Sequence, residues 1–476
     1  MAPIAFGTPG GAGPVPRAIS GNPAGPQRGS AAASGFPDNV QTQNELYSLS
    51  PRAIWSVLRR QPASFWFVCI YLFFEYVRPQ QVYKPIDVLP YARITLILAL
   101  VSFLLERRTL HFRMFEILLA IFSLIVVASS VTAFDSSHSY DKLPDFFSWV
   151  LIYMLIANTV NTEERFLIFM LSFLLYSFKM SQFGTRSWAQ DGFAFRNWGT
   201  TGAPGWFQNS GEFGIQMCIF LAVSAEFIVA LGKYWPRWLR WAAWAAPITA
   251  VTGIVASSSR GDLIGLGAVA IWAIWTSRKK ARAFTAAVVL AGLVYAITPP
   301  EQIVRLQQAG ADPTSVSRTT MWKHGLEMMR DYPILGIGYD NWTEYHDLNY
   351  GGHGLLAHNS FIQAGSELGY TGLLAFLAMI AGAFVINRRT RLLANRLADR
   401  GRFMFYMARG LDGSLVGLIV SGSFISVLYY PFFWINFAMT VALNNAALNA
   451  LRSDGSAPVS NPSTTGGRRV AVSPLR

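Results

Sequence analysis

Apolar residues fall in repeated blocks along this chain, and short polar or charged connections separate them. Most blocks approach about 20 residues, the length of helix needed to cross a hydrocarbon core of about 30 Å. The pattern therefore predicts an all-α, polytopic helical membrane protein with about twelve transmembrane helices. The predicted spans are 63–77, 91–105, 114–133, 146–160, 165–183, 211–231, 238–256, 261–276, 282–298, 370–386, 411–428 and 432–450.

The composition agrees with a membrane protein. Of the 476 residues 52% are hydrophobic and only 14% are charged, whereas a typical soluble domain carries roughly 25% charged residues. The 15 Trp and 34 Phe fit side chains that meet a membrane interface. The two cysteines, Cys69 and Cys218, lie inside apolar blocks, which excludes a disulfide framework and a cysteine metal site.

The two ends of the chain differ from its middle. Residues 1–50 are rich in Gly, Pro and Ser and lack an early apolar core, so they predict a disordered tail without a cleavable signal peptide. Residues 453–476 have the same character and predict a second disordered tail. Residues 63–450, which lie between the two tails, are predicted to form a single membrane domain.

The positions of the basic residues predict the orientation in the membrane. The net charge is +13, and short cytoplasmic loops collect Lys and Arg. The basic connections all fall on one predicted side, which we expect to be the cytoplasm together with both termini. They contain Arg52, Arg59, Arg60, Arg107, Arg108, Arg113, Lys233, Arg237, Arg240, Arg278, Lys279, Lys280, Arg282, Arg388, Arg389, Arg391, Arg396, Arg400 and Arg402.

The opposite face then holds residues 134–145, 184–210, 257–262 and 299–357. The last is the largest hydrophilic insertion between spans, and it predicts an amphipathic helix over 317–330. A loop of this length inside a membrane domain is more often functional than idle.

A histidine follows this loop directly. His358 precedes Asn359 and, further on, Glu367, just before the apolar run of the tenth span. An imidazole titrates near neutral pH and can exchange a proton with a substrate at this position. The alternative is a helix N-terminus at which His358 is one polar capping residue among several.

Four arginines on the predicted outer face are candidate anion ligands. They are Arg186 and Arg196 in the 184–210 loop, Arg260 at the mouth of spans seven and eight, and Arg318 near the start of the loop helix. The planar guanidinium matches phosphate oxygens, so converging arginines suit a pyrophosphate group. The alternative for each is a solvated loop charge or an interfacial anchor.

Other chemistries find little support. His324, His346, His353 and His358 match no zinc-ligand spacing, and residues 336–338 are a lone Gly-x-Gly without the strand of a dinucleotide site. Acidic residues inside the predicted spans are few. We therefore expect no metal, no cofactor and no nucleic-acid partner.

Three segments resemble the O-antigen ligase and Wzy-type polymerase superfamily of bacterial envelope glycan assembly. They cover roughly 200–380, in the order and spacing of that family. The segments are 257–266 (SSSRGDLIGL), 317–342 with its SRTTMW and DYPILGIGYDNW runs, and 358–373 with HNSFIQ, ELG and TGL.

The resemblance implies a ligase-type glycosyltransferase in the bacterial inner membrane, acting at the periplasmic face. It implies an undecaprenyl-pyrophosphate-linked glycan as donor, and lipid A-core or another glycan as acceptor. Neither metal nor nucleotide sugar is required. By the same resemblance His358 is the general base, and Arg260, Arg196 and Arg186 hold the pyrophosphate. Arg318 matches a motif position, and we expect it to bind phosphate or to hold the loop helix.

Two other functions stay open. A Wzy-type polysaccharide or exopolysaccharide polymerase shares the chemistry, and residues 65–93, with the run YVRPQ at 76–80, are similar to members linked to exopolysaccharide systems. A transporter of lipid-linked saccharides is the third reading. It predicts that Arg260, Arg196 and His358 are scattered along a pathway, whereas an enzyme predicts that they meet at one outer cavity. Within the enzyme interpretation, His353 is the alternative candidate for the general base.

Overall fold

The computed structural model describes residues 40–107, 110, 113–194, 199–308, 310, 312–351 and 354–453. Within these ranges all regular elements are helices, which confirms the predicted all-α fold. The α-helices are α1 Val40–Tyr47, α2 Pro51–Leu58, α3 Ala63–Tyr76, α4 Pro79–Val82, α5 Tyr91–Leu105, α6 Met114–Val131, α7 Ser136–Thr159, α8 Glu163–Gln190, α9 Ser210–Leu231, α10 Arg237–Ala243, α11 Ala245–Ala256, α12 Arg260–Thr276, α13 Lys280–Ile297, α14 Pro300–Gln307, α15 Pro313–Asp331, α16 Trp342–Tyr350, α17 Ser360–Arg396, α18 Arg402–Gly422 and α19 Pro431–Ser453. Short 3₁₀ turns are η1 Lys84–Ile86, η2 Gly232–Tyr234 and η3 Ala398–Gly401.

Each of the twelve predicted spans overlaps a helix or a helix pair. Seven helical segments of the described chain are long and apolar enough to cross a membrane, and they begin at Met114, Glu163, Ser210, Arg237, Lys280, Ser360 and Asp399. Other predicted spans fall on shorter helices, such as α3 with 14 residues and α5 with 15. The chain is therefore a helical membrane protein, while twelve spans and their orientation stay predictions.

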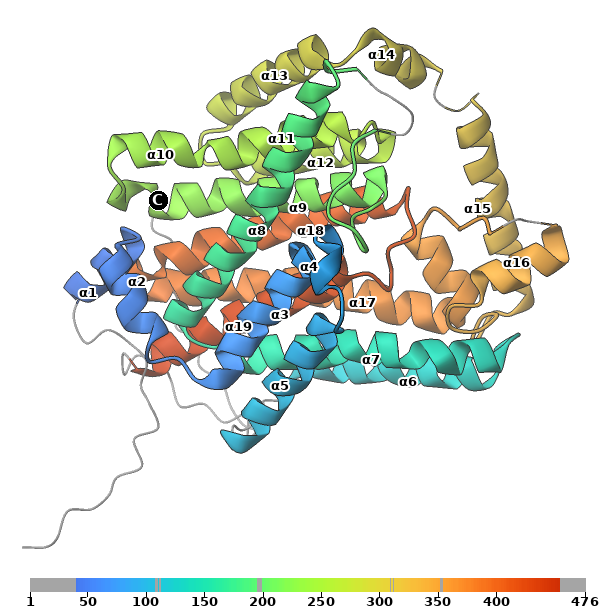
Figure 1. Cartoon of the computed structure of the whole chain (residues 1–476), viewed down its shortest axis with the longest axis horizontal. Coiled ribbons are helices and arrows are strands. Elements are labelled where there is room, and N and C mark those ends of the chain that lie inside the picture. Colours follow the sequence, from blue (N-terminus) through green and yellow to red (C-terminus); the bar gives the residue numbers. More distant parts are fainter. Residues whose placement is uncertain are drawn as a thin grey trace, which may run out of the picture. The chain divides into compact units, whose positions relative to one another are not determined.

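Helices α9, α18 and α19 form the interior of the bundle. Helix α9 packs along α18, and α11 and α12 lie against this pair (Figure 1). Helix α17 joins the two halves of the bundle, because it contacts α6 on one side and α18 and α19 on the other. No residue of α13 is buried among the described residues, so this apolar helix presents its surface outward, as a lipid-facing helix does.

The predicted N-terminal tail is only partly described. Residues 1–39 and 454–476 lie outside the described residues, but Val40–Tyr47 forms α1 where the sequence predicts a tail up to residue 50. Tyr47 is buried against the rings of Tyr234 and Phe403, and its carbonyl accepts a hydrogen bond of 2.9 Å from Trp235. The prediction missed this helix because its contacts come from distant parts of the chain.

The helix at His358 begins ten residues earlier than the predicted span at 370. Helix α17 starts at Ser360 and is interrupted at Gly369, whose φ of 68° and ψ of −176° are not helical. The sequence placed a polar connection here because Ser366 and Glu367 precede the apolar run. Both side chains are in fact buried.

The segment from Pro333 to Gly338 fills the interruption of α17. The amide of Ile337 donates to the Ser366 carbonyl at 2.9 Å, and the amide of Gly338 donates to the Glu367 carbonyl at 3.1 Å. The Tyr370 amide donates in turn to the Pro333 carbonyl at 2.8 Å. These bonds satisfy backbone groups that an interrupted helix leaves unpaired. The two motif runs at 331–342 and 358–373 therefore form one structural unit.

The predicted loop helix over 317–330 is present as α15, and it begins earlier, at Pro313. Asp312 supplies the reason, because its carboxylate accepts the Ser315 amide at 3.2 Å as an N-cap. Pro313 suits the first turn, where its missing N–H costs nothing. This earlier start brings Thr314, Ser317 and Arg318 into the site described below.

Candidate functional site

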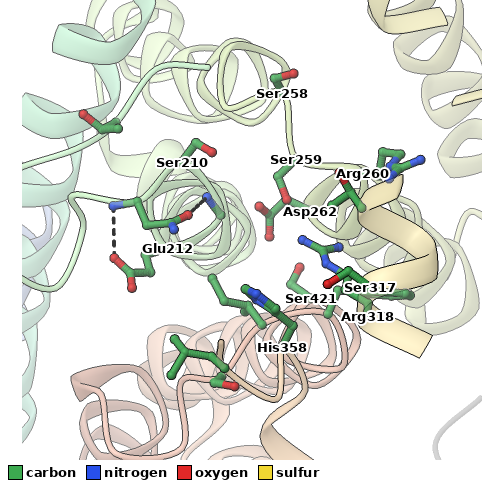
Figure 2. A pocket seen from close by; sticks show the side chains of 18 of the residues that line it. Ser210, Glu212, Ser258, Ser259, Arg260, Asp262, Ser317, Arg318, His358 and Ser421 are labelled. Atoms are coloured by element: carbon green, nitrogen blue, oxygen red, sulfur yellow. Dashed lines mark hydrogen bonds between the residues drawn. The ribbon is translucent and has the colours of Figure 1, made fainter. Parts of the chain in front are cut away.

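A cavity of about 690 Å³ lies where the loops of the predicted outer face meet. Its lining comes from the 201–212 segment, the turn between α11 and α12, the start of α15, the residues before α17 and the end of α18 (Figure 2). The lining residues are Thr201, Gln208, Asn209, Ser210, Gly211, Glu212, Ser258, Ser259, Arg260, Asp262, Pro313, Thr314, Ser317, Arg318, Leu356, His358, Ser421, Phe424, Ile425 and Ser426.

Helix N-termini surround this cavity. Of the described helices, α9, α12, α15 and α17 each begin beside it, and Ser210, Arg260, Pro313 and His358 line it at those four starts. The N-terminus of a helix carries a partial positive charge and directs free amides outward. Side chains cap three of these starts, Asn209 at α9, Asp312 at α15 and Asn359 at α17. The helix dipoles, and not free amides, therefore favour an anionic ligand here.

The backbone at His358 is held in an unusual conformation. Its φ is +48°, in the left-handed region that non-glycine residues seldom adopt. Asn359 caps α17 by accepting the amides of Phe361 and Ile362 at 2.8 and 3.1 Å. The Ser360 hydroxyl donates to the Ile425 carbonyl at 2.8 Å and so attaches the start of α17 to the end of α18. Such strain persists where the surroundings impose it, which is common at functional sites.

The His358 imidazole is neutral at physiological pH. Burial and, as the smaller cause, the positive charge of Arg318 together lower its pKa to about 4. A neutral imidazole keeps one ring nitrogen free to accept a proton. The alternative prediction, a helix-capping residue, does not describe His358, because the capping residue is Asn359.

Arg318 is the arginine directed into the cavity (Figure 2). Burial lowers the pKa of its guanidinium, as does the nearby charge of Arg260, while Asp262 and Asp312 favour its charged form. An arginine side chain stays protonated in proteins. Its Nε is buried and has no hydrogen-bond partner among the described residues.

Arg260 lines the cavity but is directed toward α15 (Figure 2). Its Nη1 and Nη2 donate to the two carboxylate oxygens of Asp312 at 2.7 and 3.0 Å. These bonds, and a further bond from Ser315, hold the pKa of Asp312 well below its usual range. The pair joins the first residue of α12 to the cap of α15, and it therefore fixes the helix that carries Arg318.

The structure brings together three of the predicted site residues, His358, Arg260 and Arg318. Arg186 does not line this cavity. It is exposed on α8, with its guanidinium 6.0 Å from the centre of the Phe183 ring. Arg196 and the rival base His353 lie outside the described residues.

Sequence reasoning missed several polar residues of the cavity. Asn209 and Glu212 form a capping box at the start of α9. The Asn209 side-chain oxygen accepts the Gly211 amide at 2.9 Å, and the Glu212 carboxylate accepts the Asn209 amide at 3.1 Å. The spacing of an Asn three residues before a Glu was a readable signal for this helix start. The sequence presents Asp262 only as part of the run at 257–266, but its side chain is buried beside the cavity.

His324 and His346 belong to a separate cluster. Nδ1 of His324 lies 3.0 Å from Nε2 of His346, and their rings stack with Tyr350 and Trp342. The part of the chain that the structure describes holds no group of three or more His, Cys, Asp or Glu side chains placed to bind a metal ion. The His324–His346 pair packs α15 against α16.

Fold and site together define a polytopic helical membrane protein with a cavity lined by Arg318, Arg260 and His358. Residues 245–377 match the family described as O-antigen ligase. The match includes Arg260, Arg318 and His358, and it confirms the resemblance to the O-antigen ligase and Wzy superfamily. It supports, in general terms, an envelope-glycan enzyme of the ligase and polymerase type. No curated protein matches the chain.

Proposed function

We propose that the chain transfers a glycan from a polyprenyl pyrophosphate, undecaprenyl pyrophosphate by the family resemblance, to a hydroxyl of an acceptor sugar. The acceptor oxygen forms a bond to the anomeric carbon of the glycan. The bond between that carbon and the pyrophosphate oxygen breaks, and its electron pair leaves with the pyrophosphate. The hydroxyl proton passes to His358. The observation that carries the proposal is a neutral histidine, a half-buried arginine and converging helix N-termini around one cavity.

The pyrophosphate is placed against Arg318 and the helix N-termini. Arg318 directs its guanidinium into the cavity, and preorganised charges of this kind stabilise a leaving group as its negative charge develops. Arg260 acts through its bonds to Asp312, which hold α15 and therefore Arg318 in place. That Arg186 and Arg196 hold the pyrophosphate stays a prediction.

His358 accepts the proton of the acceptor. In the empty cavity its pKa of about 4 keeps it neutral but makes it a weak base. A bound pyrophosphate brings negative charge beside Arg318 and His358, which favours the protonated imidazole and raises its pKa. Donor binding therefore strengthens the base in the complex in which the base is needed.

An apolar groove suits the lipid chain of the donor. It has a volume of about 480 Å³, lies between α12 and α13, and includes Leu263, Leu266, Ala287, Leu290 and Val294. Leu263 follows one residue after Asp262, which lines the polar cavity. A lipid-linked substrate needs such a junction between an apolar groove and an anion site, and this junction favours transferase chemistry on a lipid-borne donor.

The acceptor decides between two forms of the same reaction. A ligase uses lipid A-core or another glycan, and a polymerase uses a second lipid-linked repeat. The chemistry at His358 is the same in both, so the acceptor must be determined by experiment.

The test uses the purified chain in nanodiscs with undecaprenyl-pyrophosphate-linked glycan and separately added acceptors, and products are separated by size. We expect His358→Ala to lower the transfer rate by about 10² to 10⁴, the usual contribution of general base catalysis. Arg318→Ala should lower it strongly, whereas Arg330→Ala on the exposed part of the same helix should not. Full activity in a folded His358→Ala variant contradicts the proposal.

A further inference from the structure

A second cavity, of about 400 Å³, lies between the end of α3, the 78–93 segment, the middle of α7 and the loop before α9. Its walls include part of the YVRPQ run at 76–80, for which the proposed transfer site has no use. Arg78 and Gln80 of that run line it, together with Glu75 at the end of α3.

Arg78 organises this cavity from a strained position. Its φ is +46°, and its Nη2 donates to the Glu75 carboxylate at 3.0 Å. The same carboxylate oxygen accepts the indole N–H of Trp206 at 2.8 Å. Gly205 has a φ of +86°, and a Cβ at this position would collide with the Arg78 guanidinium. The run at 76–80 therefore fixes the tryptophan of a loop more than 120 residues away.

Aromatic rings form one wall of the cavity. Trp206 meets Trp149 edge to face, with ring centres 5.4 Å apart, and meets Tyr430 at 4.9 Å. Tyr91 also lines the cavity and stacks on Phe74. Aromatic faces carry negative charge in their π systems and attract the weakly positive C–H groups of a sugar ring.

Polar side chains stand beside these rings. Gln81 is exposed, and Arg93 and Asp145 form an exposed ion pair of 3.1 Å. Carboxylate, amide and guanidinium groups can each bond to hydroxyls, and bonds to charged partners are the stronger ones. Aromatic faces next to planar polar groups are suited to a polyhydroxylated ring and unsuited to a purely apolar ligand.

The second cavity adjoins the first. Trp206 lines the second, and Gln208 lines the first, so two residues of chain, at most about 7 Å, separate the two positions. Tyr430 contacts Trp206 and also lies beside Glu212 of the first cavity. A glycan whose reacting end lies at His358 can therefore reach both cavities.

We propose that this second cavity is a saccharide-binding subsite, in which sugar rings stack on Trp206 and Tyr91 and hydrogen-bond to Gln81 and Asp145. The proposal extends the proposed transferase function. Its binding test requires no transfer reaction, so the two can fail separately. The glycan bound here belongs either to the acceptor or to the donor.

The test is saturation-transfer NMR on the full chain in nanodiscs, with maltohexaose and chitohexaose as probes and the acyclic polyol sorbitol as a control. We expect contacts to the ring C–H protons of at least one oligosaccharide, and none to sorbitol. Trp206→Ala should weaken binding about tenfold, the effect of losing roughly 1.4 kcal/mol at an aromatic contact. Because Trp206 packs in the fold, Gln81→Ala and Asp145→Asn on the surface provide a second measurement, with weakening of about threefold expected.

Trp238→Ala serves as the matched aromatic control, since Trp238 is 70% exposed on α10 and lies in neither cavity. His358→Ala should bind the probe as the wild type does. Equal binding by all variants, binding lost only in His358→Ala, or no binding of either oligosaccharide overturns the subsite. In the transfer assay, a raised KM for the acceptor in Gln81→Ala identifies the acceptor glycan as the occupant, and a raised KM for the donor identifies the donor glycan.

Discussion

Arg260 and Asp312 are joined by two hydrogen bonds, of 2.7 and 3.0 Å, between the first residue of α12 and the cap of α15. The arginine that the sequence presents as a phosphate ligand already has a carboxylate partner. Arg318, carried by α15, is the arginine that extends into the cavity. The two arginines thus have different roles, since Arg260 holds a helix in place and Arg318 contacts the ligand.

The first prediction concerns this pair. Asp312→Ala and Arg260→Ala should each raise the KM for the donor, because a displaced α15 misplaces Arg318. Their effects should not add, and a double-mutant cycle should give a coupling of about 0.5–3 kcal/mol. The exposed pair Arg330–Asp331, at 3.1 Å on the same helix, is the control, with a coupling near zero expected. Additive effects for Arg260 and Asp312 contradict the positioning role.

The second prediction concerns pH. The neutral form of His358 is the base, so the kcat/KM for the donor, which reports the donor-free protein, should be constant near neutral pH and should fall as the pH drops toward the pKa of about 4. Arg318→Gln removes a positive charge that lowers this pKa, so the acid limb should move to higher pH. Burial persists in the variant, and its pKa should stay below the ordinary value for histidine. A pH–rate profile of both proteins measures the shift, and an acid limb that moves to lower pH contradicts it.

The third prediction concerns the interruption of α17. Gly369 has a φ of 68°, and a Cβ there would collide with the Ile334 carbonyl. Gly369→Ala should lower stability by about 1–3 kcal/mol, the usual cost of such backbone strain. Gly292→Ala is the matched control, because this glycine lies inside helix α13 with no atom within 4 Å of an added Cβ. Thermal unfolding in nanodiscs measures both variants, and equal melting temperatures contradict the prediction.

The fourth prediction concerns the second cavity. Gly205→Ala should both strain the backbone and push the Arg78 guanidinium away from Glu75. Gly192→Ala imposes similar strain, at a φ of +69°, but has nothing within 4 Å of its added Cβ. Only Gly205→Ala should therefore weaken oligosaccharide binding. The saturation-transfer measurement described above compares the two, and the proposed role of Arg78 fails if both variants bind alike.

The sequence predicted much of the helical framework. An apolar block of nearly membrane-spanning length must form a helix, because the membrane interior offers no water to pair its backbone N–H and C=O groups. Each predicted span does overlap a helix. The loop helix was also predictable, and so was the motif histidine at the start of α17. A helix start at His358 was one of the two alternatives for this stretch, and α17 does begin at Ser360. The predicted span began only at 370, because the polar side chains of Ser366 and Glu367 are buried by contacts that local composition does not reveal.

The candidate site was predictable in part. The run around His358 and the turn at Arg260 identified two of its members by themselves, because unusual polar residues at the ends of apolar blocks stand out in a sequence. The meeting of four helix starts at one cavity was decided by packing. So were the bond from Arg260 to Asp312, 52 residues apart, and the bond from Trp206 to Glu75, 131 residues apart. The sequence determined the helices and the chemistry of their side chains. The tertiary structure decided which charged groups share a cavity and which neutralise each other, because these contacts join residues that no local pattern connects.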